Sequence, residues 1–283
     1  MKKRLAILVT LIVGLGFLAA CSGGNKTDSS STTAETSSSS SKSSSSSSEV
    51  ESVKLTLAAA ASLEYALEEK LIPMFQKEHP EVTIEGSYDS SGKLQTQIEE
   101  GMGADLFFSA ATKQMDTLVE QQLIKDTNVS TVLENKVVLI VPADKKEGYS
   151  TFNDIEKVGT IALGDPESVP AGQYAEEALT SLGIWEGIQD KVSWGTNVTE
   201  VLNWVAEGSA DAGIVYETDA KTTDKVAVIA PAPEDSLKKK VLYPLGILES
   251  SENKQAAQTF YAFLQSKEAA EVFTEYGFTP LSK

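Results

Sequence analysis

Three residue types that build reactive or anion-binding sites are almost missing from this chain of 283 residues. Cys21 is the only cysteine, which excludes a disulfide framework and a thiolate metal site. His79 is the only histidine, and it lies between Glu78 and Pro80, where a predicted helix ends. A solvent-exposed role is favoured there, so triads that need a histidine base are poor candidates. Arg4 is the only arginine, so the rest of the chain has no guanidinium group with which to bind an anion.

The first residues have the pattern of an export signal. A basic start at positions 2–4 precedes an apolar run over 5–20, which fits a secretory signal better than a membrane-spanning helix of about 20 residues. The sequence Leu18-Ala19-Ala20-Cys21 resembles a bacterial lipobox, in which the signal is cut before a cysteine that then carries a diacylglycerol. The alternative is a plain signal peptide that ends near a cysteine. We predict a signal peptide at 1–20 and lipidation of Cys21.

Serine and threonine dominate the next segment, up to about residue 51. It has no periodic apolar residues with which to offset the entropy of ordering. We therefore predict a disordered tether over 21–51, which would keep the folded part close to the membrane.

The charge balance is strongly acidic. The formal net charge is −17, and removal of Lys2, Lys3 and Arg4 leaves 21 basic residues against 41 acidic ones. Binding to nucleic acid is excluded as a function because no basic surface is expected. An anionic ligand would have to be held by local, oriented dipoles, since the overall field repels it.

The order of predicted elements is that of an α/β protein. Strands are expected at 53–60, 82–88 and 104–110, with helices at 63–77, 93–100 and 112–122. A second set follows, with strands at 136–142, 160–163 and 211–216 and helices at 172–182 and 197–207, and the chain returns through 241–248 to helices at 254–265 and 267–276. Such alternation predicts parallel sheets and a second domain.

The loop over 164–172, Gly-Asp-Pro-Glu-Ser-Val-Pro-Ala-Gly, is the clearest candidate site. It precedes a predicted helix, and the first N–H groups of a helix are unpaired and carry about half a positive charge. An oxyanion can bind at such a place without an ionised side chain.

Two serines and a tyrosine are further candidates, each with a purely structural alternative. Ser62 follows four alanines at a predicted helix N-cap, and Ser91 lies at the next helix start, so each could cap a helix, donate to an anion, or do both. Tyr216 ends a predicted strand, where it could pack in the core or line a cleft. The segment around Gly92-Lys93 is not a nucleotide-binding phosphate loop, because the glycine spacing is wrong and Leu94 replaces the metal-binding hydroxyl.

From about residue 53 to the end, the chain resembles the molybdate-binding proteins of ABC uptake transporters. The resemblance rests on Ala-Ala-Ala-Ser-Leu at 59–63, Ser-Ser at 90–91, Ala-Asp-Leu-Phe at 104–107, the loop at 164–172 and Gly-Ile-Val-Tyr at 213–216. It implies a two-lobed periplasmic-binding-protein type II fold, in which two α/β lobes are joined by crossover strands with the ligand between them. The implied lobes are 52–134 with 242–283, and 135–241.

The resemblance also implies which residues hold the ligand. The contacts carried over to this sequence are Ser62 and Ser91 from the first lobe, and Ala171, Val198 and Tyr216 from the second. Ala171 and Val198 could contribute only backbone N–H groups. No cofactor, cation ligand or catalytic residue is implied.

The functional hypothesis is therefore an extracytoplasmic receptor, not an enzyme, that is anchored by lipid to the outer face of the cell membrane. It would bind molybdate, and tungstate as well, as a monomer and deliver the anion to an ABC permease. The alternatives are a receptor for sulfate or another tetrahedral oxyanion, a surface hydrolase, and an adhesin lipoprotein.

Overall fold

The computed structural model describes residues 52–281. The predicted signal peptide, the lipidation at Cys21 and the tether all lie outside these residues. Over the described range, no helix combines the length and the apolar character that a membrane crossing requires.

The first lobe is built on a six-stranded sheet with the strand order β11-β4-β10-β3-β1-β2. Its strands are β1 (Val53–Ala60), β2 (Val82–Asp89), β3 (Leu106–Phe108), β4 (Ile124–Asn135), β10 (Val241–Leu248) and β11 (Thr279–Pro280). Its helices are η1 (Ala61–Leu63), α1 (Glu64–Ala66), η2 (Leu67–Leu71), α2 (Ile72–Glu78), α3 (Ser91–Glu99), α4 (Thr112–Glu120), α9 (Lys254–Phe263) and α10 (Lys267–Glu275). This sheet is thus formed by two stretches of the chain, one before and one after the second lobe in the sequence.

The second lobe is built on a five-stranded sheet with the strand order β7-β6-β8-β5-β9. Its strands are β5 (Val137–Pro142), β6 (Ile161–Gly164), β7 (Val192–Gly195), β8 (Ala212–Tyr216) and β9 (Val226–Pro231). Its helices are η3 (Ala143–Lys145), η4 (Phe152–Lys157), α5 (Pro170–Ser181), α6 (Trp185–Ile188), η5 (Gln189–Lys191), α7 (Val198–Ala206), α8 (Glu217–Ala220) and η6 (Glu234–Ser236).

Both sheets are mixed, so the prediction of parallel sheets is only partly right. β1 runs parallel to β2 and β3, and β6 runs parallel to β7 and β8. β10, however, is antiparallel to β3 and β4, and β5 is antiparallel to β8 and β9. Alternation of strands and helices predicts parallel pairing only where a helix returns the chain to the same sheet. β5 and β10 instead arrive from the other lobe.

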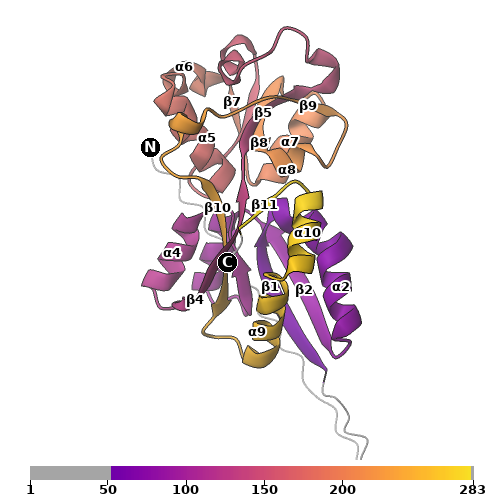
Figure 1. Ribbon diagram of the computed structural model, residues 1–283. Coiled ribbons are helices and arrows are strands. Elements are labelled where there is room, and N and C mark those ends of the chain that lie inside the picture. The colour runs from indigo at the N-terminus through magenta and orange to yellow at the C-terminus, as the bar shows by residue number, and fades with distance from the viewer. Residues whose placement is uncertain (1–51, 282–283) are drawn as a thin grey trace, which may run out of the picture. The chain divides into compact units, whose positions relative to one another are not determined.

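The chain crosses between the lobes twice. β4 of the first lobe continues through Lys136 into β5 of the second, and β9 leads back through residues 232–240 to β10 (Figure 1). This arrangement of two α/β lobes with crossover strands is the predicted fold.

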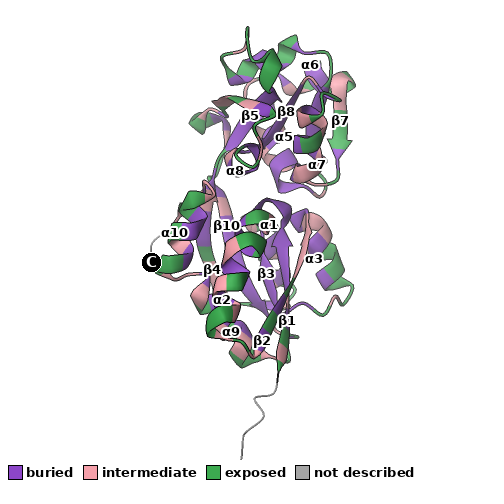
Figure 2. Cartoon of the chain, turned by 90° about the vertical axis from the view of Figure 1, so that its right-hand side faces the viewer, coloured by how far each residue is buried: buried purple, intermediate pink, exposed green. Residues whose placement is uncertain are grey.

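The first helical segment shows how the sequence pattern places the core. Leu63, Leu67, Leu71 and Phe75 recur every four residues and are fully buried. The run is not a uniform α-helix, because it begins with a 3-10 turn at η1 and contains a π-helical turn at η2. The four-residue spacing still puts one apolar face against the sheet, and buried residues likewise concentrate on the strands of both lobes (Figure 2).

Candidate functional site

A small cavity of about 10 Å³ lies between the two lobes. It is close to the volume that one water molecule requires, so a larger guest can enter only when the lobes move apart. The lining residues come from both lobes: Ala60, Ala61, Ser62, Asp89, Ser90, Ser91, Ala110, Val169, Pro170, Ala171, Val198 and Tyr216. All five residues predicted to contact the ligand are in this set, which the structure brings together from six separate segments of the sequence.

Four helical segments begin at this cavity. In the first lobe, η1 starts at Ala61 directly after β1, and α3 starts at Ser91, with one residue between it and the end of β2. In the second lobe, α5 starts at Pro170 and α7 at Val198. Because each helix start presents unpaired N–H groups, positive partial charge converges on the cavity from both sides. This is suited to holding an anion.

The predicted loop at 164–172 is held in a tight turn ahead of α5. Asp165 accepts hydrogen bonds at its backbone oxygen from Ser168 N at 3.1 Å and from Val169 N at 2.7 Å. A side chain at Gly172 would place its Cβ 2.0 Å from the Gly164 carbonyl oxygen, so this contact requires glycine. The turn brings Pro170 and Ala171 to the cavity wall.

Ser62 is not the helix N-cap that the sequence predicts. The 3-10 turn begins two residues earlier than predicted, with Ala60 in the N-cap position, and Ser62 lies inside the turn. Its hydroxyl Oγ is 2.9 Å from the hydroxyl of Tyr243, a buried residue of β10. The four alanines before Ser62 concealed the true start, because alanine carries no capping signal.

The two serines at the start of α3 have different partners. Ser91 Oγ accepts a hydrogen bond from Ala110 N at 2.9 Å, so its own proton stays available. Ser90 is the N-cap residue, but its side chain makes no capping bond. Its Oγ is buried, with 4% of the residue exposed, and has no partner among the described residues. Sequence reasoning missed Ser90 as a donor because a serine at an N-cap is usually explained by capping.

Tyr216 ends β8 and lines the cavity. The residue is 1% exposed, and within residues 52–281 its hydroxyl has no hydrogen-bond partner. Burial raises the pKa of this phenol well above its ordinary value, so the group stays protonated and can act as a donor. A buried hydroxyl without a partner is costly, which favours a ligand as its partner.

The cavity wall offers no positive side chain, since none of the described lining residues is lysine, arginine or histidine. The only charged lining residue is Asp89. Its Oδ1 accepts from Ser90 N at 2.8 Å, from Lys93 Nζ at 3.3 Å and from Asn197 Nδ2 at 3.4 Å. These donors engage the carboxylate and reduce its repulsion toward a bound anion.

Direct contacts hold the lobes together beside the cavity. Gly92 N donates to Ser168 O at 2.9 Å, which joins the start of α3 to the loop before α5. A Cβ on Gly92 would lie 2.4 Å from that oxygen and 2.7 Å from Ser168 Cα. Asn197, the N-cap of α7, also reaches Asp89 across the gap. The absence of a side chain at Gly92 is therefore what allows this closed arrangement.

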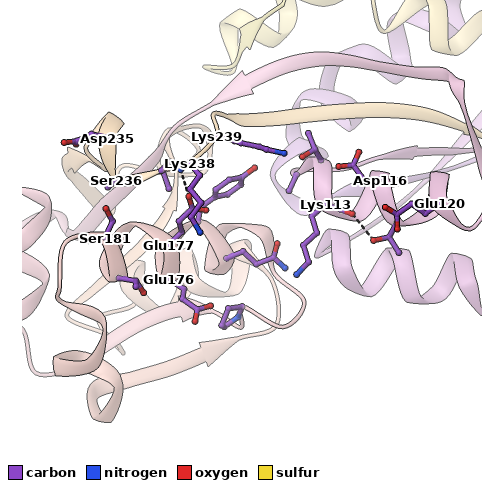
Figure 3. A pocket seen from close by; sticks show the side chains of 18 residues that line it. Lys113, Asp116, Glu120, Glu176, Glu177, Ser181, Asp235, Ser236, Lys238 and Lys239 are labelled. Carbon is purple, nitrogen blue, oxygen red and sulfur yellow. Dashed lines mark hydrogen bonds between the residues drawn. The ribbon is translucent and has the colours of Figure 1, made fainter.

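A larger groove of about 990 Å³ contains none of the five predicted ligand residues. Lys113 of α4 faces it from the first lobe, and Lys238 and Lys239 face it from the segment between β9 and β10 (Figure 3). Five acidic residues line the same groove: Asp116, Glu120, Glu176, Glu177 and Asp235. This excess of negative charge makes the groove a poor site for a dianion, despite its size.

The candidate site also differs from a cation site in its ligand chemistry. Across the part of the chain that the structure describes, no three His, Cys, Asp or Glu side chains are grouped so that they could hold a metal ion. The donors at the cavity are hydroxyl and backbone N–H groups, which match the oxygens of an anion.

Comparison with known proteins identifies the family. The family model described as bacterial extracellular solute-binding protein matches residues 55–279, so the chain belongs to this family. A Bacillus subtilis protein named "Putative ABC transporter substrate-binding lipoprotein YvgL" is 43% identical over 280 residues, which cover 99% of each chain. Molybdate-binding protein ModA of Escherichia coli is 39% identical over 232 residues, which cover 80% of this chain and 89% of that protein.

A solved structure supports the same assignment. It is described as the "substrate binding domain of putative molybdenum ABC transporter from Clostridium difficile" and is 38% identical to this chain. The match covers 82% of this chain and 100% of the other, with a TM-score of 0.64. The predicted fold class and family are therefore confirmed.

Proposed function

We propose that the protein is a molybdate receptor of an ABC importer, and that it holds the anion in the cavity between its lobes. The observation that carries this proposal is the composition of the cavity wall, where hydroxyl groups and helix starts converge from both lobes without a cation. The identity to a protein named for molybdate binding supports the choice of ligand. Tungstate has the same charge and shape, so we expect it to bind as well.

The proposed ligand contacts are Ser62, Ser91, Ala171, Val198 and Tyr216, with Ser90 as an additional hydroxyl. Hydrogen bonds to a charged group contribute about 1.5–3 kcal/mol each, so these six donors supply about 9–18 kcal/mol before the costs of desolvation and closure. Dissociation constants from micromolar to nanomolar correspond to about −8 to −12 kcal/mol. An uncharged site can therefore bind a dianion tightly.

A wall of donors also explains selectivity. Hydrogen phosphate carries a proton that a backbone N–H group cannot accept, so at the Ala171 and Val198 contacts one hydrogen bond would be replaced by a repulsive contact. Sulfate is fully deprotonated like molybdate, and the two can be separated only by the size of the closed cavity. We expect molybdate to be preferred, because the chain is 39% identical to a protein named for molybdate binding.

The place of action follows from the same proposal. The receptor works outside the cytoplasmic membrane and passes its anion to a permease, as the family assignment and the similarity to an ABC transporter lipoprotein support. Lipidation of Cys21 would anchor it to the outer face of the membrane. We further propose that it acts as a monomer, needs no cofactor and catalyses no reaction.

Competitive calorimetry with molybdate, tungstate and sulfate tests this function. We expect one site per chain, with molybdate and tungstate bound more tightly than sulfate. Tightest binding of sulfate would instead identify a sulfate receptor. A ligand at 100 times its dissociation constant stabilises the folded protein by about 2.7 kcal/mol and so raises its melting temperature. If none of the three anions changes the melting temperature, an adhesin is the better interpretation. Turnover of esters that is lost in Ser62→Ala would indicate a hydrolase.

A further inference from the structure

A buried series of hydrogen bonds leads from the cavity to the strands that connect the lobes. Ser62 Oγ lies 2.9 Å from the Tyr243 hydroxyl, which lies 3.2 Å from Asn135 Nδ2. The same amide nitrogen donates to Thr218 Oγ1 at 2.9 Å. Asn135 ends β4 and Tyr243 belongs to β10, while Thr218 lies in α8 of the second lobe, two residues after Tyr216. All four members of the series are buried.

The direction of these hydrogen bonds is fixed by the amide of Asn135. Its Oδ1 accepts from Lys136 N at 2.8 Å, which determines the end of the side chain that carries the nitrogen. Since an amide nitrogen only donates, the Tyr243 oxygen must be the acceptor of its bond with Asn135. The single Tyr243 proton then needs an acceptor, and Ser62 Oγ lies at hydrogen-bond distance from it.

The opposite direction between Tyr243 and Ser62 is less favourable. If Ser62 donated to Tyr243, the phenol proton would be buried without an acceptor, at a cost of about 1–3 kcal/mol. Burial raises the pKa of Tyr243 well above its ordinary value, so the phenol keeps its proton. Ser62 is therefore the acceptor, and its own proton is left for the cavity that it lines.

We infer that Tyr243 and Asn135 are positioning residues that turn the Ser62 hydroxyl proton into the anion cavity. The inference rests on the proposed function, because it assigns a donor role to Ser62 in binding the oxyanion. A hydroxyl that accepts one hydrogen bond is also polarised toward donating another, so the series strengthens Ser62 as a donor. Neither residue touches the ligand, since neither lines the cavity.

The packing around Tyr243 makes a clean test possible. Its ring meets Tyr216 and Phe278 edge-on, with centroids 5.7 Å and 5.4 Å away, and Tyr243→Phe preserves these contacts while removing the hydroxyl. Tyr261→Phe is the matched control. The Tyr261 hydroxyl also donates to a serine, Ser130 Oγ at 2.8 Å, but neither residue lines the cavity.

The experiment is a double-mutant cycle measured by calorimetric titration with molybdate. Tyr243→Phe should weaken binding about fivefold to tenfold, the effect of one hydrogen bond that acts through a ligand contact. In a Ser62→Ala background the same change should alter the dissociation constant by less than about twofold, because its effect passes through Ser62. Tyr261→Phe should leave the dissociation constant within about twofold of the unmodified protein while removing a part-buried hydrogen bond between the same two residue types.

Unchanged affinity in Tyr243→Phe would overturn the inference, as would an equal loss of affinity with and without Ser62. If the unmodified protein binds no molybdate, both the proposed function and the inference are wrong. If it binds molybdate but the double-mutant cycle gives one of the contrary results above, only the inference is wrong. If Tyr243→Phe does not fold, Asn135→Asp tests the same direction. The new carboxylate can accept the Tyr243 phenol proton, so the Ser62 hydroxyl proton should turn from the cavity toward the Tyr243 oxygen. Asn135→Asp should therefore weaken molybdate binding, and by a smaller factor in the Ser62→Ala background.

Discussion

Replacing Gly92 with alanine should weaken molybdate binding without destabilising the free protein. Gly92 is the second residue of α3, and its backbone N–H donates to Ser168 O in the other lobe. An added Cβ would lie 2.4 Å from that oxygen and 2.7 Å from Ser168 Cα. Both contacts are to the main chain, so no flexible side chain can move aside, and the lobes themselves must separate.

The expected magnitude follows from the two effects of that separation. Loss of one neutral hydrogen bond costs about 0.5–1.5 kcal/mol, and forced overpacking costs about 1–3 kcal/mol. Together they should raise the dissociation constant by about 30-fold to 1,000-fold, which corresponds to about 2–4 kcal/mol. The open form avoids the clash, and alanine favours a helix more than glycine does by up to about 1 kcal/mol. Stability without ligand should therefore stay constant or rise.

Calorimetric titration with molybdate measures the affinity, and thermal melting without ligand measures the stability. Gly187→Ala is the control, because Gly187 also lies in a helix, α6, but has no atom within 4 Å of an added Cβ. It should change the affinity by less than about twofold, since it lies away from the contact between the lobes. An affinity for Gly92→Ala equal to that of the control would refute the argument that the lobes close through this contact.

Other changes test the individual groups. Ser62→Ala and Ser91→Ala should each weaken binding by about 1–3 kcal/mol in the same titration, and unchanged affinity in both would reject the site. Ser91→Ala should also lower the melting temperature, because it leaves the buried Ala110 N–H without its acceptor. Burial raises the pKa of Asp219 to about 7, so the folded state holds this proton more tightly than the unfolded state does. The resulting stability is complete below the unfolded pKa of about 4 and is lost as the pH rises through about 7, at most about 4 kcal/mol in total. Asp219→Asn should therefore raise the melting temperature at pH 8 much more than at pH 5, and equal shifts at both pH values would contradict the assignment.

The sequence predicted those elements whose signals are local. The loop at 164–172 and the helix predicted from residue 197, where the Asn197 side chain accepts from Glu200 N, follow from a few adjacent residues. β4 was not predicted as a strand of twelve residues, because its first half is mostly polar and exposed. Pairing with β10, more than a hundred residues away in the sequence, holds it in the sheet.

Local patterns predicted Ser62, Ser91 and Tyr216 as candidates, and the family resemblance supplied the two backbone contacts and the set as a whole. The structure shows why local patterns could not supply the remaining features. Ser90 looks like an ordinary helix cap until its hydroxyl is found to lack a partner. The link from Ser62 to Tyr243 joins residues 181 positions apart, so no sequence window contains both. Such contacts form only when the two chain segments of the first lobe, which lie before and after the second lobe in the sequence, pack together.

The central claim is that uncharged donors from both lobes hold a dianion, and a crystal structure of the molybdate complex tests it most directly. We predict that the oxygens of the anion lie within about 3.2 Å of the Ser62, Ser91 and Tyr216 hydroxyls and of the Ala171 and Val198 N–H groups, with no lysine ammonium at that distance. A lysine Nζ bonded directly to the anion, or molybdate bound instead in the groove lined by Lys113, Lys238 and Lys239, would contradict this account.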